Sequence, residues 1–183
     1  AEVRSARAVA SPHVCRVYDL VEADGAEVVS MEYVDGTTLR QIVETRSPLE
    51  LAEAREIALQ LLAGLGAIHD AGLVHRDVKP DNVMRTRAGR VVLMDFGIAK
   101  AVASGGTVAG TPAYWAPEQA AGAAADPRAD VFAAGVVLAE MVAPGGARDE
   151  EARAALWRAL REAPPQVPDS AWSAAIRKAV ARE

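Results

Sequence analysis

Twelve residues, LVHRDVKPDNVM (Leu73 to Met84), combine an apolar frame with a high density of polar and charged side chains. These side chains occupy most of positions 75–82 and are His75, Arg76, Asp77, Lys79, Asp81 and Asn82. Such density usually marks a solvated loop, but apolar residues on both sides predict a loop that is held against a core. An acid, a base and an amide fixed this close together indicate a site of chemistry.

A second acidic residue lies a short distance along the chain. Asp95 follows the run Val91 to Met94, and the sequence DFG occupies positions 95–97. Because the run is short and wholly apolar, it predicts a strand that is buried on both faces. The strand therefore delivers Asp95 to the edge of a core, where it can meet the charged loop.

The residue types in these two segments suit phosphoryl transfer. Asn82 and Asp95 offer hard oxygen ligands for Mg²⁺, which prefers one or two carboxylates together with phosphate oxygens. Asp77 can accept the proton of a hydroxyl group, and Lys79 supplies a positive charge. Phosphoryl transfer depends mainly on positioning and on neutralisation of charge, and these residues provide both.

Three motifs in order, HRDVKPDN (75–82), DFG (95–97) and APE (116–118), resemble the eukaryotic-like, or Hanks-type, protein kinases. The forms DVKPDN and GTPAYWAPE (110–118) are similar to the serine/threonine-specific branch in bacteria. The resemblance covers essentially the whole chain. It implies an α+β, protein-kinase-like fold with a remnant of the N-terminal lobe at residues 1–34 and an incomplete, helical C-terminal lobe at 35–183.

The resemblance also implies roles for matching residues. The catalytic set is Asp77 as the base, Lys79 at the γ-phosphate, Asn82, and Thr111, which braces the base. The cofactors would be ATP and Mg²⁺ (or Mn²⁺), with the metal held by Asn82 and Asp95. The ATP contacts would be Met31, Glu32, Val34, Thr38, Lys79, Met84 and Asp95.

A further set of matches is structural or regulatory. Glu2 would pair with an ATP-binding lysine before residue 1, Asp130 would hold the backbone of the charged loop, and Thr107 is the first choice for a phosphorylation site, ahead of Ser104. Arg76 would receive that phosphate. The complete set is Glu2, His75, Arg76, Phe96, Gly97, Ser104, Thr107, Glu118 and Asp130. Glu118 is expected to lack the arginine that usually pairs with it.

Local patterns predict the main elements. Residues 14–21 and 26–33 read as strands, and Thr37 or Thr38 as the N-cap of a short helix. Ser47 is predicted to cap a second helix, with Glu50 closing a capping box, and Gly72 to end it. Residues 2–9 read as the end of a helix, and residues 126–142 as a central apolar helix. Trp157 and Trp172 are expected to anchor helices to the core.

Composition limits the remaining possibilities. The chain has 183 residues, 51% of them hydrophobic, and a formal net charge of −5, which argues against a nucleic-acid partner. Cys15 is the only cysteine and is expected to be buried, while His13 and His69 read as surface or capping residues. We expect a cytoplasmic protein with no membrane segment in this chain. Its implied partners are proteins with Ser/Thr acceptors and a second kinase molecule.

The Gly-rich loop and the ATP-binding lysine of the family would precede residue 1. We therefore expect a fragment that is truncated at both ends and is inactive or very weak on its own. One alternative is a non-catalytic, kinase-like module that binds nucleotide or scaffolds partners. Another is a small-molecule phosphotransferase, although those enzymes lack the segment GTPAYWAPE.

Overall fold

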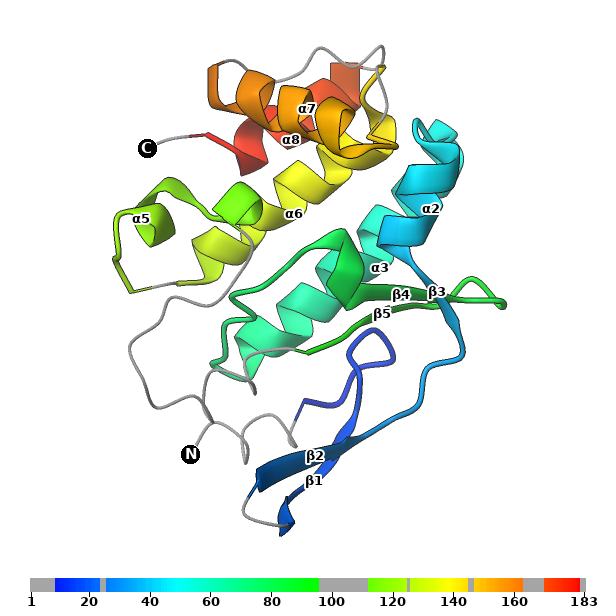
Figure 1. Ribbon diagram of the computed structural model, residues 1–183, viewed down its shortest axis with the longest axis vertical. Helices are drawn as coiled ribbons and strands as arrows, with labels where there is room; N and C mark the ends of the chain where they lie inside the picture. The colour runs from blue at the N-terminus through cyan, green and yellow to red at the C-terminus, as the bar shows by residue number, and fades with distance from the viewer. Residues whose placement is uncertain are drawn as a thin grey trace.

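The structure of the protein is a computed structural model that describes residues 9–23, 26–95, 112–124, 126–144, 147–162 and 170–181. In Figure 1 the C-terminal helices, drawn in yellow to red, lie above two small sheets. The α+β, protein-kinase-like fold class expected from the motifs is confirmed. Within the described residues, no helix is both long and apolar enough to cross a lipid bilayer.

The strands of the described residues form two separate antiparallel sheets. A two-stranded sheet pairs β1 (Val17–Ala23) with β2 (Ala26–Met31). A three-stranded sheet has the order β3 (Gly36–Thr38), β4 (Val83–Thr86) and β5 (Val91–Leu93). Every residue of β5 is buried, as predicted, but the strand ends at Leu93, and Met94, the last residue of the predicted run, is only partly buried.

The first predicted strand begins later than its apolar pattern suggested. Val14 does not join β1 but forms an isolated parallel bridge with Leu93 of β5. The Cys15 N–H donates to the Leu93 carbonyl oxygen at 2.8 Å, and the Leu93 N–H donates to the His13 carbonyl oxygen at 2.9 Å. These long-range bonds hold residues 13–15 against the second sheet, so only the residues that follow can pair with β2.

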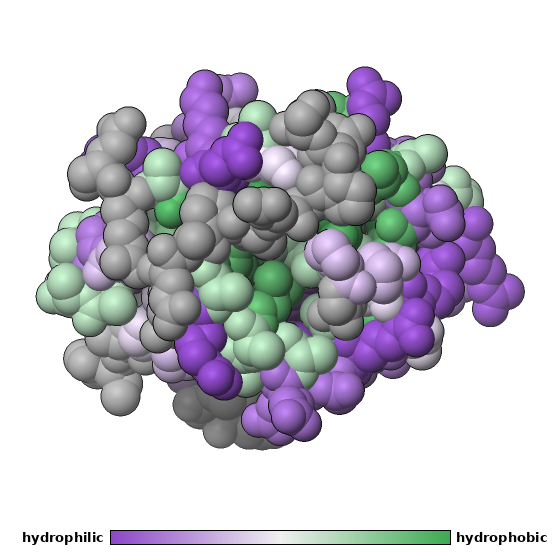
Figure 2. Space-filling model, turned by 90° about the horizontal axis from the view of Figure 1, so that it is seen from above, coloured by the Kyte–Doolittle hydropathy of each residue, from purple (hydrophilic) through white to green (hydrophobic). Residues whose placement is uncertain are grey.

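Most of the body is helical. The helices are α2 (Leu39–Arg46), α3 (Leu51–Asp70), α5 (Pro117–Ala120), α6 (Pro127–Val142), α7 (Glu150–Glu162) and α8 (Ser170–Ala179). Two short 3₁₀ helices are η1 (Pro80–Asn82) and η2 (Pro112–Tyr114). On the face seen from above in Figure 2, hydrophobic residues lie near the centre and hydrophilic ones lie mainly around them.

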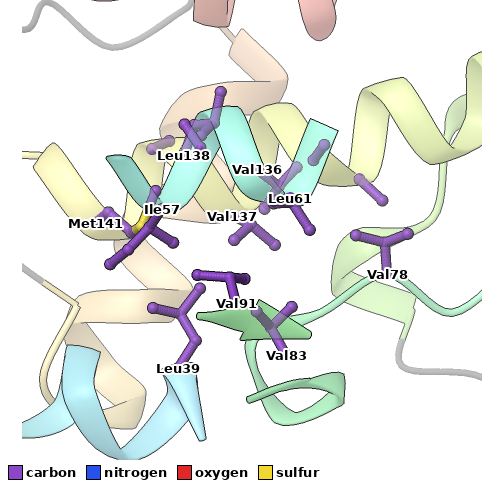
Figure 3. Close-up of a cluster of buried hydrophobic side chains, with 14 of the residues drawn as sticks. Leu39, Ile57, Leu61, Val78, Val83, Val91, Val136, Val137, Leu138 and Met141 are labelled. Atoms are coloured by element: carbon purple, nitrogen blue, oxygen red, sulfur yellow. The ribbon is translucent and has the colours of Figure 1, made fainter. Parts of the chain in front are cut away.

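Helix α6 forms the centre of the core, as predicted. Twelve of its sixteen residues are buried, which is typical of a helix that is apolar on all sides. Figure 3 shows side chains of α3, α6 and β5 converging, among them Leu61, Val137 and Val91. Trp157 and Trp172 pack against the same core from α7 and α8, which confirms their expected role as anchors.

The ends of two helices test the capping predictions. Thr38, one of the two predicted residues, is the N-cap of α2, and it also forms a capping box with Gln41 that was not predicted. Gly72, at φ +72°, follows the end of α3, also as predicted. The prediction for Ser47 is wrong, since α3 begins at Leu51 and its N-cap, Glu50, forms no side-chain hydrogen bond.

Ser47 instead ends α2 and joins it to the core. Its side chain is fully buried; the hydroxyl donates to the Glu140 carbonyl oxygen at 2.7 Å and accepts from the Ala147 N–H at 3.0 Å. Both partners lie about 100 positions away in the sequence. This tertiary contact uses the hydroxyl that a local capping box would have needed.

Two glycines of α3 provide a matched test of packing. A Cβ atom at Gly64 would lie 2.7 Å from the His13 carbonyl oxygen and 2.9 Å from Leu93 Cδ1, whereas one at Gly66 would meet nothing within 4 Å. We expect Gly64→Ala to lower the free energy of unfolding by about 1–3 kcal/mol. Gly66→Ala is expected to raise it by up to about 1 kcal/mol through helix propensity. Urea unfolding of both variants measures this, and equal shifts would contradict it.

Candidate active site

The charged loop is fixed to helix α6 by one buried carboxylate. Asp130 lies in the first turn of α6 and is only 1% exposed. Its Oδ2 accepts from the His75 N–H and its Oδ1 from the Arg76 N–H, each at 2.8 Å. Arg76 has a left-handed backbone with φ +68°, a costly conformation that surrounding contacts must hold. Asp130 supplies one such contact.

Asp130 has a third partner that the sequence did not indicate. Its Oδ2 lies 2.8 Å from Nε2 of His69, near the end of α3. The expectation that His69 is a surface or capping residue is therefore wrong. The side chain is partly buried because α3 and α6 pack against each other at this point. The other histidine with that expectation, His13, has its ring Nδ1 3.0 Å from the Val91 carbonyl oxygen.

The ring of His75 links the loop to the end of β5. It is 1% exposed, and its Nε2 lies 3.0 Å from the Met94 carbonyl oxygen. Its Nδ1 accepts from the Asp77 N–H at 3.3 Å, so the proton resides on Nε2. Burial lowers the pKa of His75, against the opposing charge of Asp130, and the ring therefore acts as a neutral, fixed connector.

Asp77 lies at the centre of a small polar cluster. Its Oδ2 is 3.0 Å from Lys79 Nζ and accepts from Asn82 Nδ2 at 2.9 Å. The same amide nitrogen donates to the Asp77 carbonyl oxygen at 2.9 Å. The Asp77 and Lys79 side chains are 29% and 20% exposed, so both can meet a substrate. The geometry thus presents a carboxylate and an ammonium group at the surface, with the buried Asn82 amide directly behind them.

The structure brings Asp95 next to this cluster through the backbone. Asp95 directly follows Met94, whose N–H donates to the Asn82 carbonyl oxygen at 2.8 Å and whose carbonyl oxygen contacts His75. Asp95 is exposed and has φ +55°. Strained non-glycine residues of this kind cluster at functional sites. Asp77 and Asp95, which are predicted to act together, thus lie on two backbone segments that hydrogen bonds join directly.

The donor set fits a magnesium ion better than a metal that needs many protein ligands. Within the described ranges, no group of three or more His, Cys, Asp or Glu residues could hold a metal. Asn82 donates from Nδ2 to both the carbonyl oxygen and Oδ2 of Asp77, so its Oδ1 takes no part in these hydrogen bonds. One amide oxygen and the exposed Asp95 carboxylate match the sparse protein ligation typical of Mg²⁺ bound with phosphates.

An apolar cluster lies beside the polar one. Cys15, Val34 and Val92 are buried in it, and the partly buried residues Met31, Met84 and Met94 pack against them. Three residues predicted to contact ATP (Met31, Val34 and Met84) therefore lie together in one apolar cluster. Burial, followed by the charges of Glu32 and Asp95, raises the pKa of Cys15 to about 11. This buried thiol, as expected, is an unreactive part of the packing.

Two other predicted ATP contacts have protein partners. An ion pair joins Glu32 Oε1 to Arg90 Nη2 at 2.6 Å, and hydrogen bonding to Arg90 lowers the pKa of Glu32. The side chain thus points to the β4–β5 region. The Glu32 backbone is also engaged, since its N–H donates to the Arg16 carbonyl oxygen at 2.8 Å and its carbonyl oxygen accepts from Cys15 Sγ at 3.5 Å. The Thr38 hydroxyl accepts from the Gln41 N–H at 3.2 Å, so a ribose contact would use the hydroxyl as a donor.

The remaining predicted site residues divide into two groups. Glu118 lies in α5 and forms no ion pair with any residue that the structure describes. The others lie outside the described residues: Glu2, Phe96, Gly97, Ser104, Thr107 and Thr111. Their roles stay predictions.

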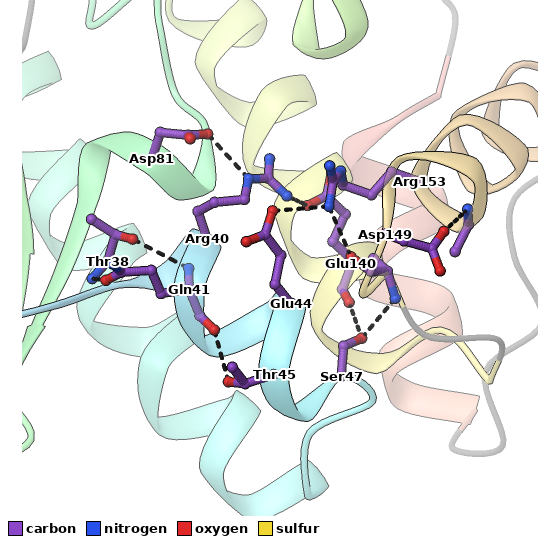
Figure 4. A network of polar contacts seen from close by, with 12 residues as sticks. Thr38, Arg40, Gln41, Glu44, Thr45, Ser47, Asp81, Glu140, Asp149 and Arg153 are labelled. Carbon is purple, nitrogen blue, oxygen red and sulfur yellow. Dashed lines mark hydrogen bonds and ion pairs between the residues drawn. The ribbon is translucent and has the colours of Figure 1, made fainter.

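Sequence reasoning missed two groups of residues. Cys15, Val92 and Met94 complete the apolar cluster, but only long-range strand pairing reveals this. Arg40 and Glu140 meet across 100 positions in sequence and join a network that also contacts Asp81 (Figure 4). No local pattern indicates such a contact.

Comparison with known proteins agrees with this geometry. A family model described as "Protein kinase domain" matches residues 1–162. Over 151 residues the chain is 41% identical to the serine/threonine-protein kinase PknB of Mycobacterium leprae, covering 77% of this chain and 24% of PknB. It is 37% identical over 146 residues to a probable serine/threonine-protein kinase of Bifidobacterium longum, with 77% and 19% covered.

A probable serine/threonine-protein kinase of Streptomyces coelicolor is 40% identical over 152 residues, which cover 77% of this chain and 23% of that protein. The chain thus spans about a quarter or less of the length of these curated relatives. The family model, in contrast, matches most of the chain. On this match, supported by the charged loop and its anchoring to α6, the chain belongs to the protein kinase domain family.

Proposed function

We propose that this chain is the catalytic part of a serine/threonine protein kinase, which transfers the γ-phosphate of ATP to Ser or Thr hydroxyls of proteins. The observation that carries the proposal is the Asp77 carboxylate, bonded to Lys79 and Asn82 on a loop that Asp130 fixes. The names of the curated relatives support the same activity.

The proposed roles follow the chemistry of each group. Asp77 orients the acceptor hydroxyl and takes its proton as the hydroxyl oxygen bonds to the γ-phosphorus and ADP leaves. Lys79 stabilises negative charge on the transferred phosphoryl group. Asn82 and Asp95 would hold Mg²⁺ or Mn²⁺, which supplies charge neutralisation at the phosphate oxygens. The apolar cluster around Met31 and Met84 would bind the adenine base.

Residues 1–34 would be the N-terminal lobe remnant and 35–183 the C-terminal lobe. The compartment would be the cytoplasm, since the chain has a single, buried cysteine and such a kinase needs ATP. Its partners would be proteins with Ser/Thr acceptors. A kinase dimer and phosphorylation at Thr107 or Ser104 stay predictions.

The experiment compares the full-length protein with the isolated chain. Each is incubated with labelled ATP, Mg²⁺ and an array of Ser/Thr peptides, and nucleotide binding is measured separately by calorimetry. We expect phosphate transfer by the full-length protein and little or none by the isolated chain. Binding of nucleotide by the full-length protein without any transfer would contradict the proposal and support a nucleotide-binding scaffold.

A further inference from the structure

A single guanidinium group joins three segments of the chain beside the active site. Arg40 lies in the first turn of α2, and its side chain is only 13% exposed. Its Nε donates to Asp81 Oδ2 at 3.3 Å, its Nη1 donates to Glu140 Oε2 at 3.1 Å, and its Nη2 donates to the Tyr114 hydroxyl. Figure 4 shows this side chain reaching from α2 between Asp81 and Glu140.

The Glu140 carboxylate lies at the buried end of this network, and both of its oxygens accept hydrogen bonds. Glu140 is 0% exposed, and its Oε1 accepts from the Tyr114 hydroxyl at 2.6 Å and from Trp157 Nε1 at 2.8 Å. Burial and the adjacent Glu140 carboxylate raise the pKa of Tyr114, so its phenol stays protonated. The Tyr114 hydroxyl therefore accepts from Arg40 and donates to Glu140, and its position depends on both.

Two of the segments that Arg40 contacts belong to the proposed reaction. Asp81 lies between Lys79 and Asn82, directly before the residue that bonds to Asp77. Tyr114 belongs to the segment GTPAYWAPE, to which the resemblance to Ser/Thr kinases assigns the positioning of the acceptor peptide. A planar guanidinium can donate hydrogen bonds to three acceptors in directions that its plane fixes, which an ammonium group cannot do.

We propose that Arg40 is a positioning residue. It fixes the charged loop, at Asp81, relative to the segment GTPAYWAPE, at Tyr114. It would thereby set how well an acceptor hydroxyl is aligned with Asp77. This inference rests on the proposed kinase activity and adds to it a residue that controls the use of the peptide rather than of ATP. A small displacement of a positioned substrate can lower the rate by about 100-fold.

The first test is Arg40→Lys in the full-length protein, with Arg153→Lys as the matched control. Arg153 also ties α2 to the body, through Glu44 Oε1 at 3.1 Å, and has a similarly buried side chain, but no contact with Asp81 or Tyr114 is among its hydrogen bonds. For a peptide chosen on the array with the unaltered protein, we expect kcat/KM to fall about 10- to 100-fold in Arg40→Lys. KM for ATP should not change, because Arg40 forms hydrogen bonds with none of the proposed ATP-binding residues that the structure describes. Equal peptide kcat/KM in the two variants would overturn the inference.

A second variant separates positioning from the burial of charge. Arg40→Met combined with Glu140→Gln removes both buried charges and leaves no unpaired carboxylate in the core. If Arg40 only neutralised Glu140, the double variant would regain both the stability and the peptide phosphorylation that Arg40→Met alone loses. We expect urea unfolding to show a higher stability for the double variant than for Arg40→Met alone, while its peptide kcat/KM stays low. Recovery of both would overturn the inference.

A measurement without catalysis distinguishes the inference from the proposed function. Amide resonances of Asn82 and Trp115, which adjoin Asp81 and Tyr114, should shift in Arg40→Lys but not in Arg153→Lys. If the unaltered protein transfers no phosphate, the proposed function fails and the positioning of peptide fails with it. If it does transfer phosphate and these resonances do not shift, the inference alone fails.

Discussion

Asp77→Asn is expected to lower phosphate transfer by about 10²- to 10⁴-fold, the usual contribution of a positioned general base. The amide has the shape of the carboxylate but cannot take the hydroxyl proton. Its oxygen can still accept a hydrogen bond from Lys79 or Asn82, which now contact Asp77 Oδ2 at 3.0 and 2.9 Å. The loop is also held by Asp130, so the fold should persist. Single-turnover assays of the full-length protein measure the effect, and calorimetry checks that ATP still binds.

Asp126→Asn is the matched control for this exchange. Asp126 is the N-cap of α6 and lies on the surface, where its side chain accepts from the Arg128 N–H at 2.7 Å. Asparagine caps helices about as well as aspartate, so the control should keep both stability and activity. If Asp77→Asn transfers phosphate as fast as Asp126→Asn, Asp77 is not the base.

The parts of the fold that the sequence predicted are those determined by local patterns. Helix α6 is apolar on all sides and β5 is a short apolar run, and each pattern has one favourable solution, burial. Thr38 and Gln41 are three residues apart and satisfy each other within one turn. Local chemistry decides such features before any tertiary contact forms.

The predictions that were wrong concern residues whose partners are distant in the sequence. Ser47 has the right neighbours for an N-cap, but distant backbone groups of Glu140 and Ala147 take its hydroxyl. His69 has a polar ring near a helix end, but a buried carboxylate 61 positions away lies beside it. In both cases the hydrogen-bond partner belongs to α6 or to the residues that follow it, and nothing in the local sequence predicts that contact.

The candidate site shows the same division. The charged loop was predictable because its functional groups are close in sequence. Glu140 was not, because a lone glutamate in an apolar helix gives no sign of its partners. The structure shows that Arg40, Tyr114 and Trp157 compensate its burial. Without those three donors a buried carboxylate would be strongly destabilising.

The largest effect on stability is expected for Asp130→Ala. The exchange leaves the N–H groups of His75 and Arg76 without the carboxylate that each now contacts at 2.8 Å. An unsatisfied buried donor costs about 1–3 kcal/mol, and His69 loses its partner as well. We therefore expect the free energy of unfolding to fall by about 2–6 kcal/mol, the sum over both donors. Urea unfolding of the chain measures it.

Asp126→Ala is the matched control. It shows whether the loss of an aspartate near the start of α6 is by itself enough to lower the stability this much. That exchange removes an exposed cap and should cost only about 0.5–2 kcal/mol. Hydrogen exchange gives a second, local readout, because the amides of His75 and Arg76 donate to Asp130. In Asp130→Ala they should lose protection selectively, while the amides of α3 exchange only through global unfolding. Equal destabilisation by the two variants, with His75 and Arg76 still protected, would mean that the loop is held by contacts other than the Asp130 carboxylate.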